Sequence, residues 1–517
     1  MRRTRSCRSR MPLSPAIERT RERSIKMREA DGMSGLPQLK MLRLWCIPVR
    51  PKSAEVRMRF DRSISKLRDS GQAVAHYGLA IIALAICLVF LPLCAGGQAG
   101  MPGPQKEELT VIRAGTLIDG KGGPPRANQV IVVRGYRIER VQDAAAGEIP
   151  AEAKVIDLSK ATVLPGLIDA HTHIFLQGED PAQGGYDVQL LKYGLAFRAA
   201  RAAVAARRAL EQGFTTIRDV ETEGAGYGDV GIKQAIEQGY IPGPRVFAST
   251  RAISTTGGYP LEGYAPEIEV PKGVQIIDGP VEARKAAREQ LDHGADWIKV
   301  YMTHRSWLDK QGNLVSQPTL TLEELKAIVE EVHGWKKKVA CHAYNGEGLH
   351  RALDGGCDSI EHGLELDDAA IVQMVRQGTW YCPTLSVYYY HWAPENTPAG
   401  RRDRKRVALH ITSFQKALRA GVKIAFGTDV GGFPWTDSIA QEFPRMVEMG
   451  MSPMDAIRSA TSRAAELLDM QGELGVIAPG AYADIIAVAG DPLKDIRELE
   501  RVRFVMKNGS VFKNEMR

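Results

Sequence analysis

The segment LPGLIDAHTH at residues 164–173 constrains the fold of this chain more than any other. A Pro-Gly pair and a short apolar run end in two histidines one residue apart, His171 and His173. Successive side chains of a β-strand point to opposite faces, so both imidazoles lie on the same face. Two adjacent imidazoles at the end of a strand form half of a first-row metal site. The alternative is a pair of polar residues in a turn.

Short apolar segments recur from residue 164 to residue 470 and alternate with helical patterns, which is typical of a parallel (β/α)8 TIM barrel. One long pattern, Leu190–Glu211, is rich in Ala and Arg, and its spacing fits an outer barrel helix with a solvated face. We therefore predict an α/β fold with a hydrolase barrel over 164–470. Eight segments fit its strands: LPGLIDAH, FTTIRDV, RVFAST, DWIKVYM, KKVACHAY, DSIEHG, WYCPTLSV and KIAFGTDV.

Alternating polar and apolar runs at both ends of the folded region predict a second, smaller domain. Residues 107–163 contain LTVIRAGTLID and NQVIVVRGYRIERV, separated by Gly-rich turns, and these read as antiparallel strands. Residues 471–517 repeat the pattern, with a hairpin turn expected at Asn508-Gly509. We expect the two parts to pair into one small β-sandwich formed by both ends of the mature chain.

The N-terminal region is basic and has the layout of an export signal. Residues 1–57 are rich in Arg and Ser, and we predict a disordered extension. Residues 58–99 follow with a charged start, the apolar run GLAIIALAICLVFLPL and small residues, as in a secretory signal peptide. We expect an exported protein, periplasmic or secreted. Contact with a membrane would come only from this segment, or from a lipid anchor on Cys94.

Charge and cysteine content exclude two further classes. Residues 1–76 carry 19 Lys+Arg against 7 Asp+Glu, so the remainder of the chain is net acidic despite the overall charge of +7. No basic stripe is left to neutralise phosphates, and we expect no nucleic-acid partner. Of seven cysteines, four fall in the N-terminal region, and the remaining Cys341, Cys357 and Cys382 predict no disulfide framework.

Polar side chains end or interrupt five of the eight predicted strands. Besides the first pair, these are Lys299, His342, His362 and Asp429. Active sites of barrels lie at the C-terminal ends of the strands. Burial of the ammonium inside an apolar strand is costly, so Lys299 either pairs with a carboxylate or reacts as a neutral amine with carbon dioxide. The resulting carbamate is an oxygen ligand that bridges two cations, and the full set fills two metal sites.

The motifs LPGLIDAHTH, FTTIRDV, IKVY, CHAY, IEHG and FGTD resemble those of the metal-dependent amidohydrolase superfamily. From about Leu109 onward, the chain is similar to the imidazolonepropionase-related group, which includes Xaa-Pro dipeptidases and ochratoxin-type amidases. The more group-specific stretches are PGPRVFASTRAISTTGGY and GADWIKVY. The resemblance implies that His171, His173 and Asp429 hold the more buried ion, that His342 and His362 hold the second, and that carbamylated Lys299 bridges them. Imidazolonepropionases are mononuclear and lack this lysine, so Lys299 argues against that activity.

The function expected from this site is hydrolysis of the amide bond in small peptides or peptide-like molecules, as in Xaa-Pro and related dipeptidases. Two divalent ions, for which we expect zinc, would share a hydroxide, with Asp429 as general acid and base. A dipeptidase must recognise a free carboxylate, and the candidates near the predicted site are Tyr259, Tyr301, His304 and Arg305. We also expect a homo-oligomer.

Three alternatives remain open at this stage. The same ligands serve lactonases and phosphotriesterases, and they also serve enzymes that hydrolyse cyclic amides. Some barrel relatives have lost their ligands and act as interaction scaffolds, but this chain retains all six ligand types.

Overall fold

The computed structural model describes residues 108–516 apart from 147–148, 260, 262 and 391–392. The predicted basic extension (1–57) and export segment (58–99) lie outside the described residues. Within the described part, no helix has both the length and the apolar character needed to cross a membrane.

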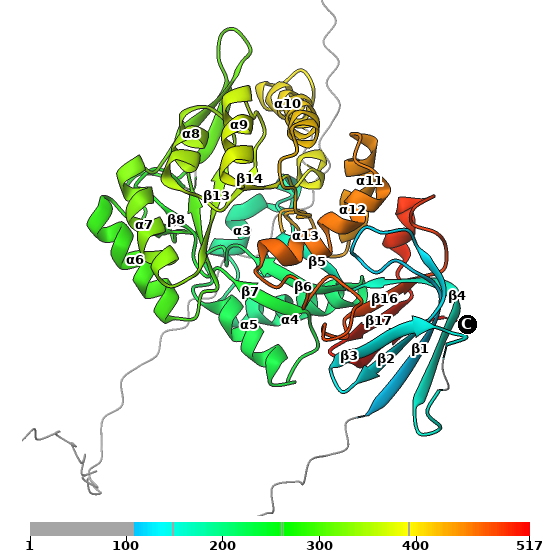
Figure 1. Ribbon diagram of the computed structural model, residues 1–517. Helices are drawn as coiled ribbons and strands as arrows, with labels where there is room; N and C mark the ends of the chain where they lie inside the picture. The colour runs from blue at the N-terminus through cyan, green and yellow to red at the C-terminus, as the bar shows by residue number, and fades with distance from the viewer. Residues whose placement is uncertain (1–107, 147–148, 260, 262, 391–392, 517) are drawn as a thin grey trace, which may run out of the picture. The chain divides into compact units, whose positions relative to one another are not determined.

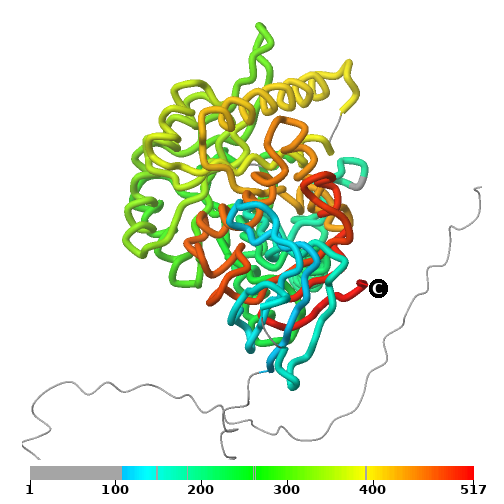
Figure 2. The backbone as a smooth tube through the Cα atoms, turned by 45° about the vertical axis from the view of Figure 1, so that its right-hand side comes forward, coloured from blue at the N-terminus to red at the C-terminus, as the bar shows by residue number. Residues whose placement is uncertain are grey.

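Both ends of the described chain contribute strands to one sheet, as predicted. Its strand order is β18-β17-β16-β4-β1-β2-β3, so a C-terminal strand lies beside an N-terminal one. Figures 1 and 2 both show the red C-terminal strands next to the blue and cyan N-terminal ones. The bounds are β1 (Leu109–Leu117), β2 (Arg126–Arg134), β3 (Arg137–Asp143), β4 (Lys154–Pro165), β16 (Ile485–Val488), β17 (Phe504–Lys507) and β18 (Ser510–Asn514).

The pairing of this sheet differs from the prediction in one place. Strands β1 and β4 run parallel, with Thr110 opposite Lys154, so the all-antiparallel interpretation is wrong here. After β1 the chain passes through the β2–β3 hairpin and residues 144–153 before it reaches the free edge of β1. Strand β4 therefore runs in the same direction as β1. The predicted hairpin turn is confirmed, because β17 and β18 pair around Asn508 and Gly509, which have positive φ angles of 48° and 74°.

A single curled sheet replaces two separate layers in this domain. The edge strand β3 reaches the segment that leads into β16, since the Ile138 amide donates to Ala481 O over 2.9 Å and Gly480 N donates to Ile138 O over 2.8 Å. Alternate residues of all the central strands share one buried apolar cluster, which includes Ile112, Ile485 and Phe504. The alternation of apolar residues therefore predicts the buried face of these strands correctly. The curl of the single sheet takes the place of the second layer that the β-sandwich prediction required.

Two parallel sheets make up the larger part of the fold. Seven of the eight predicted parallel strands form as strands, and the flanking helices cover them (Figure 1). The bounds are β5 (Leu167–Thr172), β6 (Phe214–Asp219) and β7 (Arg245–Ala248) in one sheet, and β8 (Ile253–Ser254), β9 (Gln275–Ile276), β10 (Trp297–Tyr301), β13 (Lys338–Ala343), β14 (Ser359–His362) and β15 (Trp380–Cys382) in the other, with a separate hairpin of β11 (Thr303–Leu308) and β12 (Leu314–Pro318).

Hydrogen bonds join these two sheets in two places. The Asp296 amide donates to Ala248 O over 2.7 Å, which links the start of β10 to β7. The predicted eighth strand, residues 423–430, forms isolated bridges instead of a ladder. Its Ala425 amide donates to Tyr381 O over 3.0 Å, and the Ala170 amide donates to its Phe426 O over 2.9 Å. This segment therefore connects β15 with β5.

The predicted Ala- and Arg-rich helix forms as two helices. Lys192 caps the end of α3, and Gly194 with an extended backbone caps the start of α4. A row of alanines on α4 is buried, so this helix packs against the sheet as expected. The helices are α3 (Gly185–Leu191), α4 (Leu195–Glu211), α5 (Gly228–Glu237), α6 (Pro280–Asp292), α7 (Leu322–Gly334), α8 (Gly346–Gly355), α9 (Asp368–Gln377), α10 (Pro398–Ala420), α11 (Glu442–Glu448), α12 (Pro453–Ser459) and α13 (Ser462–Leu467).

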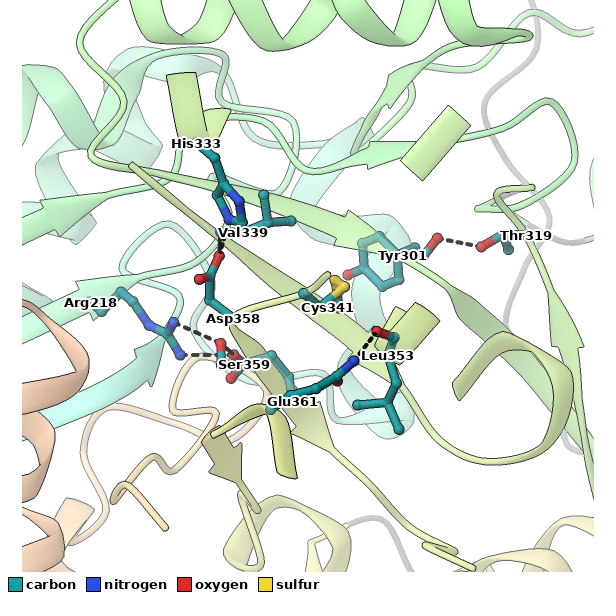
Figure 3. Close-up of a disulfide and its surroundings, with 12 residues drawn as sticks. Arg218, Tyr301, Thr319, His333, Val339, Cys341, Leu353, Asp358, Ser359 and Glu361 are labelled. Atoms are coloured by element: carbon teal, nitrogen blue, oxygen red, sulfur yellow. Dashed lines mark hydrogen bonds and ion pairs between the residues drawn. A yellow bond between two sulfur atoms is a disulfide. The ribbon is translucent and has the colours of Figure 1, made fainter. Parts of the chain in front are cut away.

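One disulfide corrects the cysteine prediction. Cys341 of β13 is bonded to Cys357, and their Cα atoms are 6.1 Å apart, whereas Cys382 is free and buried. Helix α8 returns the chain so that Cys357 comes next to the neighbouring strand, which spacing alone does not reveal. Figure 3 shows the surroundings of this disulfide, and Cys341 is paired with Ile360 of β14. The disulfide therefore links the segments that carry His342 and His362.

Candidate active site

The predicted ligands converge on one cavity at the C-terminal ends of the parallel strands. The cavity has a volume of about 130 Å³, and His173, Lys299, His342, His362 and Asp429 line it. The imidazole of His171 lies behind them with no exposed surface, and its Nε2 is 3.7 Å from Asp429 Oδ1. Residues from five separate segments of the chain thus meet at one place.

Asp429 lies at the centre of this group. Its Oδ1 is 3.1 Å from His173 Nε2, and its Oδ2 is 3.9 Å from His362 Nδ1. Potential ligand atoms of His171, His362 and Asp429 all lie within 4.8 Å of one another. Asp429 and His362 have positive φ angles of 63° and 72°, an unusual backbone conformation for these residues. Such strain is concentrated at functional sites, where surrounding contacts hold it in place.

Burial keeps three of the histidines neutral. It lowers the pKa of His171, His342 and His362 well below the usual value, and neighbouring cationic groups lower it further. The Nε2 atoms of His171 and His342 are buried and have no hydrogen-bond partner among the described residues. Neutral imidazoles with unpartnered buried nitrogens are suitable donors for a transition-metal ion.

His173 has the opposite electrostatic environment. Burial alone would lower its pKa, but the hydrogen bond and charge of Asp429, together with Glu223, raise it to about 10. Its Nδ1 lies 3.2 Å from the Glu221 carbonyl oxygen and 3.6 Å from Glu223 Oε1. At His173 the effect of Asp429 and Glu223 therefore outweighs that of burial and of Lys299, and such an environment favours bound cations.

Lys299 is buried in β10 at the wall of the cavity, 1% exposed. It contributes to the electrostatic environment of all four predicted histidine ligands. Within the described residues, no carboxylate forms an ion pair with its Nζ, so the structural role that would require such a pair lacks support. The arrangement instead matches the expectation that this lysine lies beside the imidazoles.

A second layer of polar groups fixes the orientation of His171. Glu361 Oε2 lies 2.6 Å from His171 Nδ1, and the fully buried Arg218 donates from Nη2 to Glu361 Oε1 over 2.9 Å. Arg218 also donates to Ser359 Oγ over 3.1 Å (Figure 3). A carboxylate that accepts from Nδ1 fixes the tautomer and leaves Nε2 free for a metal ion.

The four predicted substrate-binding residues have different environments. Tyr301 Oη donates to Glu221 Oε2 over 2.6 Å, and Tyr259 Oη donates to Glu223 Oε2 over 3.1 Å, so both hydroxyls already have carboxyl partners. His304 lines the cavity, and burial lowers its pKa to about 4, with smaller effects of Arg305 and Arg406. Arg305 itself is exposed and is not among the described residues that line the cavity.

Comparison with known proteins identifies the family. The model of the amidohydrolase family matches residues 162–512. The chain belongs to the amidohydrolase family. It is 34% identical to ochratoxinase of Aspergillus niger over 78% of this chain and 87% of that protein. It is 27% identical to the imidazolonepropionase of Nocardia farcinica over 70% of this chain and 86% of that protein.

A solved structure shows the same relationship in three dimensions. A Xaa-Pro dipeptidase with methionine bound in its active site superposes with a TM-score of 0.70 at 36% identity, covering 79% of this chain and 100% of that one. The protein is therefore a metal-dependent amidohydrolase that acts on carbon–nitrogen bonds. The alternative hypothesis of a catalytically inactive scaffold is therefore wrong.

Several acidic and basic groups of this amidohydrolase site were not predicted from the sequence. Glu361 directly precedes a predicted ligand, and Arg218 lies inside a predicted strand, so both were within segments already singled out. A charged residue in an apolar strand was the signal that identified Lys299, and the same signal applies to these two. Glu179, Glu221 and Glu223 lie in loops, where such a signal is absent.

Proposed function

We propose that this amidohydrolase is a binuclear enzyme that hydrolyses the amide bond of dipeptides and similar small molecules. The observation that carries the proposal is the convergence of four imidazoles, Lys299 and Asp429 on one cavity. The similarity to a Xaa-Pro dipeptidase and to ochratoxinase supports an amide substrate. We also propose that the two parallel sheets and residues 423–430 form one (β/α)8 barrel, as the family implies.

The donor set fits two divalent ions. His171, His173 and Asp429 would hold one, His342 and His362 the other, and a carbamate on Lys299 would bridge them. Zinc suits this set of imidazole and carboxylate donors. Bound ions of this kind lower the pKa of water and polarise the scissile carbonyl group.

Asp429 is the residue that we assign to proton transfer. Its carboxylate faces the cavity beside the imidazoles, where it accepts a proton from the attacking water and delivers it to the leaving nitrogen. Glu361 and Arg218 hold His171 in position from behind. The tyrosine hydroxyls bound to Glu221 and Glu223 fix one wall of the cavity.

The size of the site supports a small substrate. An outer cavity of about 190 Å³ adjoins the inner one, and four residues line both: Glu179, Tyr344, Val387 and Asp429. Each volume is below the roughly 300–1,000 Å³ of sites for drug-sized ligands. A dipeptide fits this space better than a long peptide does.

The test is turnover by the zinc-loaded protein on a panel of Xaa-Xaa and Xaa-Pro dipeptides, together with cyclic amides, lactones and phosphotriesters. We expect dipeptides to have the highest kcat/KM and a chelator to abolish their turnover. Asp429→Asn should lower kcat by about 10²–10⁴-fold, because it removes the proton-transfer group. Preference for a lactone or phosphotriester, or wild-type turnover in Asp429→Asn, would contradict the proposal.

A further inference from the structure

The outer cavity contains charged groups that the hydrolytic chemistry does not use. Arg402, Asp403 and Arg406 of α10 line it, together with Glu179, Tyr344 and Tyr388. None of these charged residues was in the predicted substrate-binding set, and both tyrosines of that set donate hydrogen bonds to glutamates.

Arg406 is held rigidly at the wall of this cavity. Its Nε donates to Ser306 Oγ over 3.0 Å, and its guanidinium carbon lies 5.3 Å from the centre of the Tyr344 ring. Asp403 Oδ1 is 3.9 Å from Arg406 Nη1 and accepts a hydrogen bond from Arg402 Nη2 over 3.0 Å. Two guanidinium groups thus share one carboxylate, and this side of the cavity carries excess positive charge.

Glu179 contributes a carboxyl group to the same cavity. It lies after β5, where backbone hydrogen bonds hold residues 178–179 against the turn that follows Asp429: Gly178 N donates to Gly431 O over 2.8 Å, and Glu179 N donates to Gly432 O over 3.1 Å. Its side chain lines both cavities. Within the described residues, no lysine or arginine forms an ion pair with it. Burial raises the pKa of the Glu179 carboxyl to about 8, and the charges of Glu223 and Asp429 act in the same direction. An ammonium group placed beside this carboxyl would favour its ionised form.

We propose that Glu179 binds the ammonium group and Arg406 the carboxylate of an unblocked dipeptide, so that its scissile bond lies at Asp429. Asp429 lines both cavities, as does Glu179, while Arg406 lines only the outer one. This inference rests on the proposed function and specifies its substrate class: zwitterionic dipeptides, with acyl-blocked and amidated peptides as poor substrates. It also assigns the substrate carboxylate to α10 and not to the predicted set of Tyr259, Tyr301, His304 and Arg305.

The experiment compares three matched substrates with the zinc-loaded full-length protein: Ala-Phe, N-acetyl-Ala-Phe and Ala-Phe amide. Glu179→Gln should lower kcat/KM for Ala-Phe about tenfold or more, because a charge-assisted hydrogen bond is lost, and leave N-acetyl-Ala-Phe unchanged. Arg406→Gln should lower kcat/KM for Ala-Phe similarly and leave Ala-Phe amide unchanged. Zinc content and circular dichroism establish that each variant is folded.

Matched controls lie close to each position. Asp180→Asn changes the carboxyl next to Glu179, and Lys416→Gln removes a charge from the same helix as Arg406; both should match the wild type on all three substrates. Equal losses on free and blocked peptides would overturn the charge-recognition proposal while the dipeptidase function stands. If the wild type hydrolyses another amide of the panel but not Ala-Phe or any other dipeptide, the proposed function fails and this inference with it.

Discussion

At the scale of single residues, consecutive positions in β14 perform different tasks. Glu361 binds His171 and Arg218, whereas His362 faces the cavity. Alternation along a strand would place neighbouring side chains on opposite faces. The left-handed backbone of His362 (φ 72°) interrupts that alternation at the end of the strand, so both side chains reach the same site.

Glu361→Gln tests the positioning role at this scale. The amide keeps the shape but loses the charge that stabilises Arg218 and the fixed tautomer of His171. We expect metal affinity and kcat to fall by about 10–100-fold, as for other groups that orient metal ligands. Zinc titration and steady-state kinetics measure the two effects.

Ser359→Ala is the matched control for Glu361→Gln, because Ser359 contacts the same carboxylate but leaves the charge in place. Its effect on zinc affinity should be much smaller. Unchanged zinc affinity in Glu361→Gln would show that His171 is oriented by other contacts.

At the scale of elements, α7 and β14 are joined by a titratable contact. His333 Nε2 at the end of α7 lies 2.9 Å from Asp358 Oδ2, which also accepts from the Val339 amide over 2.8 Å (Figure 3). The hydrogen bond to Asp358 raises the pKa of His333 above its usual value. Asp358 adjoins Cys357 in sequence, so the contact and the disulfide fix the same end of β14.

This contact predicts a pH-dependent contribution to stability. A histidine whose pKa is raised on folding stabilises the folded state below its unfolded pKa of about 6.5, and the effect is lost as pH rises through the folded value. His333→Gln should therefore lower the free energy of unfolding at pH 5.5, by no more than about 1 kcal/mol because the side chain is partly exposed. At pH 8.5 the loss should be smaller. Urea unfolding at both pH values measures the difference.

Asp358→Asn provides the partner variant for this prediction. It removes the same charge pair, so the loss in the free energy of unfolding should again be larger at pH 5.5 than at pH 8.5. A further loss, equal at both pH values, should come from the weakened hydrogen bond to the Val339 amide. A loss in His333→Gln that is equal at pH 5.5 and 8.5 would show that the pair contributes no charge-dependent stability.

At the scale of the whole molecule, we propose that the protein is exported and oxidised. The signal-like segment 58–99 supports export, and the Cys341–Cys357 disulfide supports an oxidising compartment. Intact mass spectrometry of protein purified from its native host should show a chain that begins near residues 95–101, with a mass two hydrogens below that of the reduced form. An N-terminus before residue 58, or two free thiols, would contradict this proposal.

Much of the fold could be predicted because its signals are local. The period of apolar residues indicates seven of the eight parallel strands, and polar residues at strand ends indicate the cavity. Residues 423–430 pair too irregularly to count as a strand, although their apolar pattern marks the correct position. The parallel pairing of β1 with β4 was missed because it depends on the path of the chain after β3, which leaves no pattern in either strand.

By itself, the sequence determined the order of the elements and the residue types available as metal ligands, because both depend on neighbours along the chain. Only the tertiary structure decided that Glu361 supports His171, since 190 positions separate them. The same holds for the acidic Glu179 and the basic Arg406, which belong to distant segments and line one cavity only after folding. Contacts of this kind depend on distance in space, on which one-dimensional patterns carry no information.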